Sequence, residues 1–165
     1  MITRDRMDTI TSLAQEFLSL PSIAIVGISS SKQNVANTVF RKLRAGRAVI
    51  YPVGRNTPVF EDGPCYPDLA SLPTTVRGVF IAVRPENIPS VIDQCIALKV
   101  THVWLHNSGG TSLPAAMNET RRAVERCRAN HITVIPGACP MMFVKDADLG
   151  HRCMKWFLSV TGNLK

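Results

Sequence analysis

Short apolar segments alternate with stripes of apolar residues at helical spacing along most of this sequence. This alternation limits the fold more than any other feature. The apolar segments lie at residues 23–28, 48–53, 79–83, 101–105 and 132–135. A short run without polar residues at every second position is typical of a strand that is buried on both faces. Apolar stripes between these runs indicate helices, so the pattern predicts βαβ units and a parallel sheet.

The predicted fold is therefore a Rossmann-like three-layer α/β/α arrangement with a five-stranded, mostly parallel sheet. We expect a single domain over residues 1–165, with an N-terminal helix over 5–20, a βαβ core over 22–136 and a C-terminal helix over 148–162. Right-handed crossovers place helices on both faces of such a sheet. Ligands bind at the carboxyl ends of its strands, so the residues that follow each strand are the candidate site residues.

Composition narrows the function classes. Hydrophobic residues make up 45% and charged residues 19% of the 165 residues, which is typical of a globular protein. No apolar run approaches the length of a membrane span, and the N-terminus lacks the apolar core of a secretory signal. Five scattered cysteines without CxxC or Cys/His metal spacing predict reduced thiols, no metal site and a cytoplasmic location. The net charge of +7 favours an anionic partner, but no nucleic-acid recognition motif is present.

The first predicted strand is followed by a polar loop, Gly27-Ile-Ser-Ser-Ser-Lys-Gln-Asn34, which leads into a helix. Backbone N–H groups and the helix dipole favour a phosphate at such a position, and Lys32 adds a positive charge. The alternative is an ordinary strand–helix turn that Ser31 or Asn34 caps.

The second predicted strand helps to choose between nucleotides. A dinucleotide site has the pattern G-x-G-x-x-G and an acidic residue about 20 residues further on, which binds the ribose. Here Ser29 and Lys32 occupy the second and third glycine positions, and no acidic residue follows the strand over 48–53 directly. This pattern argues against NAD. Arg55 favours an additional phosphate, as in NADP or coenzyme A (CoA).

Four short motifs follow the strands in order: Gly27-x-Ser29, Pro52-Val53, Val83-x-Pro85 and Gly137-x-Cys139-Pro140. This order resembles the small, free-standing CoA-binding proteins, which are similar to the N-terminal domain of the succinyl-CoA synthetase α subunit. The resemblance covers roughly residues 20–145, and residues 150–156 resemble a tail found in some of these proteins.

The resemblance implies roles for eight residues. The pyrophosphate is expected at Gly27, Ser29, Ser30 and Lys32, the adenosine at Val53 and Arg55, and the adenine or pantetheine path at Val83 and Pro85. Arg55 or Lys42 is expected near the 3′-phosphate. Asn37 stands where the family suggests a small residue, often glycine, so its side chain is expected to narrow the phosphate site.

Catalytic residues are harder to identify. Cys139, just past the last predicted strand, could act as a nucleophile or acyl carrier with His106 as its base. The alternative is a partly buried thiol that only shapes its loop. The related synthetases carry their phosphorylated histidine in a second domain, for which this sequence leaves no room. The expected function is thus binding of CoA or acyl-CoA, with no identifiable catalytic centre.

Other functions remain open on the sequence alone. An NADP-dependent oxidoreductase or a redox-sensing nucleotide-binding protein fits the same fold. The chain could also be a subunit whose catalytic partner is a separate chain. Its apolar terminal helices could pack in a homodimer.

Overall fold

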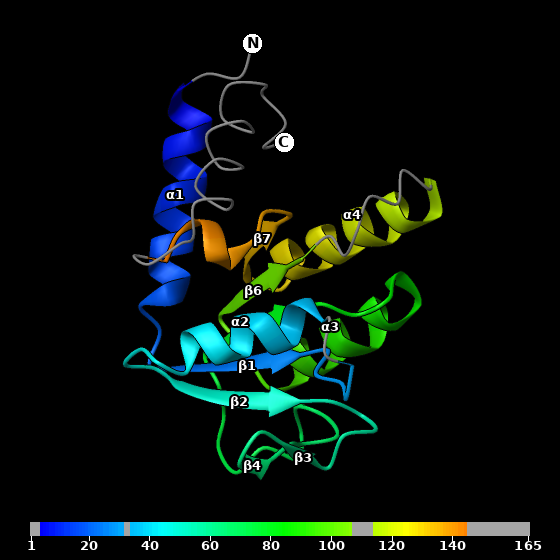
Figure 1. The fold of residues 1–165 in the computed structure, drawn as a ribbon. Helices are drawn as coiled ribbons and strands as arrows, with labels where there is room; N and C mark the ends of the chain where they lie inside the picture. Colours follow the sequence, from blue (N-terminus) through cyan, green and yellow to red (C-terminus); the bar gives the residue numbers. More distant parts are fainter. Residues whose placement is uncertain (1–3, 32–33, 107–113, 145–165) are drawn as a thin grey trace.

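The computed structural model describes residues 4–31, 34–106 and 114–144 (Figure 1). Its helices are α1 (Arg4–Leu18), α2 (Val35–Leu43), α3 (Ile88–Ala97) and α4 (Pro114–Ala129), and two 3₁₀ turns span Pro85–Asn87 and Pro140–Met142. The main-sheet strands are β1 (Ser22–Val26), β2 (Val49–Val53), β5 (Gly78–Ile81), β6 (His102–Leu105) and β7 (Thr133–Pro136). A small hairpin consists of β3 (Val59–Phe60) and β4 (Gly63–Pro64). The helix expected over 148–162 lies outside the described residues.

The main sheet has five parallel strands in the order β2-β1-β5-β6-β7 (Figure 1). This sheet confirms the predicted Rossmann-like α/β fold. In β1, the second strand of this order, Ala24 pairs with Tyr51 of β2 on one side and with Val79 of β5 on the other. Strand order reverses between β1 and β5, because the chain first moves outward to β2 and then returns past β1. Ligands in open α/β sheets bind at this kind of reversal, outside the carboxyl ends of the strands.

Two apolar cores cover the two faces of the sheet. Val79 and Ile81 of β5 belong to the core that includes α3 and α4, whereas Phe80 belongs to the core that includes α1 and α2. Alternate residues of one strand are thus buried on opposite faces, which explains why the strands are apolar throughout. Trp104 of β6 is fully buried on the α1 side, where its ring meets Phe17 edge-on at 5.4 Å between centroids.

The connection from β2 to β5, residues 54–77, contains no α-helix. It carries the β3–β4 hairpin and returns to the edge of the sheet, where Val53 forms a parallel bridge with Tyr66. Figure 1 shows the chain leaving the carboxyl end of β2 and the β3–β4 hairpin lying alongside β2, on the side away from β1. One side of the sheet edge is therefore bordered by loops rather than by a helix.

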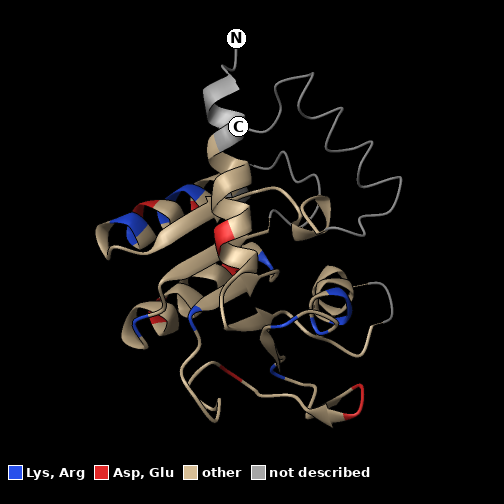
Figure 2. Ribbon diagram, turned by 90° about the vertical axis from the view of Figure 1, so that its left-hand side faces the viewer, with Lys and Arg blue, Asp and Glu red and all other residues tan. Residues whose placement is uncertain are grey.

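Two groups of basic residues lie on helices at opposite faces of the sheet, α2 and α4, and others are scattered over the loops (Figure 2). Several of them have acidic partners: Arg41 pairs with Glu61, Arg122 with Glu119, and Arg126 with Asp93. The positive charge is therefore distributed and partly compensated. No helix in the described ranges is both long and apolar enough to cross a membrane.

Gly78, at the start of β5, provides a test of how α1 packs on the sheet. A Cβ atom at this position would lie 2.6 Å from Leu20 Cδ1 and 3.1 Å from the Phe17 ring. We expect Gly78→Ala to lower the free energy of unfolding by about 1 kcal/mol, because the end of the Leu20 side chain can turn away whereas the fully buried Phe17 ring must shift. Gly63→Ala is the matched control, since no atom lies within 4 Å of its Cβ position. Urea denaturation measures both variants, and equal losses would contradict this packing.

Candidate functional site

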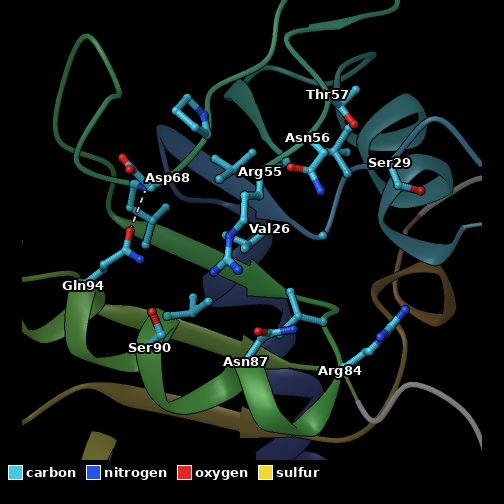
Figure 3. A pocket seen from close by; sticks show the side chains of 18 of the residues that line it. Val26, Ser29, Arg55, Asn56, Thr57, Asp68, Arg84, Asn87, Ser90 and Gln94 are labelled. Atoms are coloured by element: carbon cyan, nitrogen blue, oxygen red, sulfur yellow. Dashed lines mark hydrogen bonds between the residues drawn. The ribbon is translucent and has the colours of Figure 1, made fainter.

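A pocket of about 610 Å³ lies at the carboxyl ends of β1, β2 and β5. Its volume is within the range of small-molecule sites. The lining comes from the loop after β1, the loop after β2, the segment after β5 and one side of α3 (Figure 3). The pocket therefore lies at the reversal of strand order between β1 and β5, on the edge of the sheet where the sequence predicts a ligand.

Two glycines allow the loops to approach one another at this edge. Gly27 has a φ of +116°, and a Cβ there would lie 2.2 Å from the carbonyl oxygen of Ala82. A Cβ at Gly54 would lie 2.3 Å from the carbonyl oxygen of Ile28. Both positions therefore require glycine. The sequence motifs identified Gly27 but not Gly54.

The loop after β1 is held by two asparagines of the α2 N-terminus. Asn34 is the N-cap, and its Oδ1 accepts hydrogen bonds from the N–H groups of Ala36 and Asn37 at 2.7 and 3.2 Å. Asn37 is fully buried and bonds to the backbone of Ser29 and Ser31. The asparagines thus satisfy backbone groups of both the loop and the helix terminus.

The side chain of Arg55 lies in the middle of the pocket. Figure 3 shows its side chain crossing the pocket toward the helix that carries Ser90 and Gln94. Arg55 has no ion pair with another described residue. Arg84 also lines the pocket, but its side chain is 84% exposed and lies 3.9 Å from Glu86. Among the described residues, no carboxylate therefore competes with an anionic ligand for an ion pair with Arg55.

Asp68 is the acidic residue among the lining residues. Its Oδ1 accepts hydrogen bonds from the backbone N–H of Ser71 at 2.8 Å and from the Ser71 hydroxyl at 2.7 Å. The carboxylate therefore stabilises its own turn. Figure 3 places Asp68 and Gln94 at one end of the pocket and Ser29 and Thr57 at the other, with Arg55 between them.

A polar stripe on α3 and its N-terminus forms another wall of the pocket. Asn87, Ser90 and Gln94 are spaced by three and four residues and all line the pocket. Gln94 Oε1 accepts a hydrogen bond from the N–H of Leu69 at 2.9 Å, which ties α3 to the loop after β2. Asn87 stands at the N-cap of α3 without a side-chain capping bond. The sequence analysis missed these residues, although polar residues at helical spacing on an apolar helix were a usable signal.

Most of the residues that the sequence singled out for CoA lie together. Six of the eight line the pocket: Gly27, Ser29, Ser30, Val53, Arg55 and Val83. Pro85 is not among the lining residues, since it begins the 3₁₀ turn and its neighbours Arg84 and Asn87 line the pocket instead. Lys32 lies outside the described residues.

Two further expectations about this site need correction. Lys42 lines a different pocket, at the amino ends of β1 and β2, because it lies in the last turn of α2. Lys42 is therefore at the opposite end of α2 from the loop after β1. Asn37 does not line the pocket at the strand ends, because its side chain lies beneath the loop and bonds to its backbone.

Cys139 and His106 do not form a nucleophile–base pair in this structure. Cys139 is 8% exposed, and burial raises the pKa of its thiol. The ring of His106 donates from Nδ1 to the carbonyl oxygen of Ala138 at 3.2 Å, and burial lowers its pKa. A protonated thiol beside a neutral imidazole is unreactive compared with a thiolate. Neither residue lines the pocket, and no cluster of potential metal ligands occurs in the described parts of the chain.

Comparisons with known proteins extend this description. A family model described as a CoA binding domain matches residues 21–145. A hypothetical protein from Pyrococcus horikoshii OT3 has a similar structure, with a TM-score of 0.68, 20% identity, and coverage of 88% of this chain and 92% of that one. A Thermus thermophilus protein, cell-free ID.343, aligns with a TM-score of 0.61 at 18% identity, over 84% of this chain and 93% of that one.

A part of a larger enzyme is also similar. It belongs to the dinucleotide-forming acetyl-coenzyme A synthetase 1 of Ca. Korarchaeum cryptofilum, whose structure contains phosphate and ADP. The TM-score is 0.65 at 22% identity, over 77% of this chain and 27% of that one. These similarities show a common fold. No curated protein sequence matches the chain significantly.

His106 should make the stability of the fold depend on pH. Burial lowers its pKa below the ordinary value of 6.5, so the unfolded chain binds a proton that the folded chain resists. Stability should therefore fall as the pH drops below about 6.5, by at most about 1.4 kcal/mol per pH unit. We expect His106→Gln to reduce this loss in urea denaturation between pH 7 and pH 5. Equal slopes in the wild type and the variant would contradict a buried, neutral imidazole.

Proposed function

Because the chain belongs to the CoA binding domain family, we propose that it binds coenzyme A or an acyl-CoA in the pocket at the carboxyl ends of β1, β2 and β5. The observation that carries this proposal is Arg55, which lines the pocket without an ion-pair partner among the described residues. A guanidinium binds phosphate groups through charge-assisted, often bidentate hydrogen bonds, and CoA carries a phosphate monoester on its ribose.

The position of Arg55 favours the ribose phosphate of CoA. In dinucleotide-binding proteins, the residue after the second strand recognises the ribose. A carboxylate at this position accepts a hydrogen bond from the ribose hydroxyl. Here Arg55 takes this place after β2, and the Asp68 carboxylate is engaged by Ser71. We therefore assign Arg55 to the 3′-phosphate of CoA.

The remaining lining suits the other parts of CoA. Apolar side chains of Val26, Val53, Val83 and Val91 contribute to the pocket, and an adenine ring or the dimethyl group of pantetheine can bury its surface against them. The Gly27–Ser30 loop supplies polar groups for the pyrophosphate. No catalytic step is part of this proposal, since Cys139 and His106 lie outside the pocket lining.

NADP is the second candidate ligand, because its 2′-phosphate also suits Arg55. It would make the protein an oxidoreductase or a redox sensor. The family match favours CoA over NADP. Titration with both ligands separates the two functions.

Arg55→Ala tests the assignment of the 3′-phosphate. We expect the variant to lose about 1.5–3 kcal/mol of CoA binding free energy, a ten- to hundredfold weaker Kd, because one charge-assisted contact is removed. Binding of 3′-dephospho-CoA should change less than twofold, since the contacted group is already absent. Isothermal titration calorimetry measures both ligands.

Arg84→Ala is the matched control for this experiment. It removes the other arginine of the lining, whose side chain is 84% exposed and lies near Glu86, so its effect on CoA binding should be much smaller than that of Arg55→Ala. Equal losses for CoA and dephospho-CoA in Arg55→Ala would overturn the assignment. Binding of NADP without binding of CoA would move the protein to the oxidoreductase class.

A further inference from the structure

We propose that Asn34 is a positioning residue that commits the hydroxyl of Ser29 to donate its proton to a phosphoryl oxygen of the ligand. This inference rests on the proposed function and concerns the end of the pocket where Ser29 and Thr57 lie (Figure 3). Its basis is the set of hydrogen bonds that occupy the donors and acceptors of the loop after β1.

The orientation of the Asn34 amide is determined by its partners. Its Oδ1 accepts from the backbone N–H groups of Ala36 and Asn37, so this atom is the oxygen. The Nδ2 atom therefore donates, and it bonds to the carbonyl oxygen of Gly27 at 3.1 Å and to Ser29 Oγ at 3.2 Å. Exchange of the two amide ends would put two donors against two N–H groups.

The backbone that carries Ser29 is equally constrained. The Nδ2 atom of Asn37 donates to the carbonyl oxygens of Ser29 and Ser31 at 2.8 and 2.9 Å, and its Oδ1 accepts from the Ser29 N–H at 3.2 Å. Asn37 is fully buried, so its end of each of these bonds is shielded from water. The loop is thereby fixed before any ligand arrives.

The Ser29 hydroxyl then has one remaining use. Its oxygen accepts from Asn34 Nδ2 and from the N–H of Ser31, both at 3.2 Å, which occupies both lone pairs. The hydroxyl proton has no acceptor among the described residues. Since Ser29 lines the pocket, a ligand group that only accepts hydrogen bonds is its complement. Phosphoryl oxygens are such groups, whereas a ligand N–H finds no free lone pair on the Ser29 oxygen.

Thr57 provides an independent indication of a ligand at this end. Its side chain lines the pocket and is only 8% exposed, yet its hydroxyl has no hydrogen bond to another described residue. No described side-chain N or O atom is fully buried without a partner, so the Thr57 oxygen keeps access through the pocket. A nearly buried hydroxyl of this kind is stabilised when a ligand completes its hydrogen bonds.

Asn34→Asp tests the commitment of the hydroxyl. Aspartate keeps the N-cap of α2 but replaces the amide donor with an acceptor, so Ser29 should turn its proton toward residue 34 and away from the ligand. We expect Asn34→Asp and Ser29→Ala each to weaken CoA binding about tenfold or more. Asn34→Asp also removes the donor to the Gly27 carbonyl oxygen, and Ser29→Ala removes an acceptor of the loop. The melting temperature of each variant without ligand is therefore measured beside its affinity. Ser31→Ala is the control, since its side chain is exposed and outside the pocket lining.

A double-mutant cycle makes the test decisive. If Asn34 acts through Ser29, the combined Asn34→Asp and Ser29→Ala variant loses less CoA affinity than the product of the two single factors. A full product overturns the inference and leaves the proposed function intact.

ADP serves as a second phosphoryl probe. Binding of ADP without CoA by the wild type overturns the proposed function, and the same cycle is then measured with ADP. Binding of neither ligand by the wild type overturns both proposals.

Discussion

The carbonyl oxygen of Val53 joins the two loops that form the pocket. It accepts hydrogen bonds from the N–H groups of both Gly27 and Ile28 at 3.0 Å, so the chain after β1 is held against the end of β2. Gly27 and Gly54 make this approach possible, because a Cβ at either position would collide with a backbone carbonyl. The pocket at the ends of β1, β2 and β5 depends on this contact, because it holds the loop after β1 and the loop after β2 at a fixed distance from one another.

The same close packing changes how this edge of the sheet can attract an anion. A helix N-terminus usually offers free N–H groups to a phosphate, but at α2 the groups of Ala36 and Asn37 already bond to Asn34. The Ser29 N–H is likewise bonded to Asn37. Affinity for an anion must therefore depend more on Arg55 and on hydroxyl groups than on the helix dipole.

The sequence predicted the fold best at the strands that are buried on both faces. Each strand of the main sheet lies between two apolar cores, so its residues form a mostly apolar run that indicates its position to within two residues at either end. The site was predictable where it follows these strands directly, as at Ser29, Val53 and Arg55. Thr57 escaped prediction because residues 54–77 form an irregular connection without helical or strand periodicity.

Asn37 shows why sequence reasoning misjudged one residue of the site. A polar side chain near a phosphate loop suggests a steric obstacle as long as its direction is unknown. The side chain instead enters the space beneath the loop, where the carbonyl oxygens of Ser29 and Ser31 would otherwise lack these partners. A small residue at this position would leave these two carbonyl oxygens to water or without a partner, and an unsatisfied group that is shielded from water costs about 1–3 kcal/mol. The side chain of Asn37 therefore helps to keep the pocket open, because the loop that it holds by hydrogen bonds cannot collapse toward the helix.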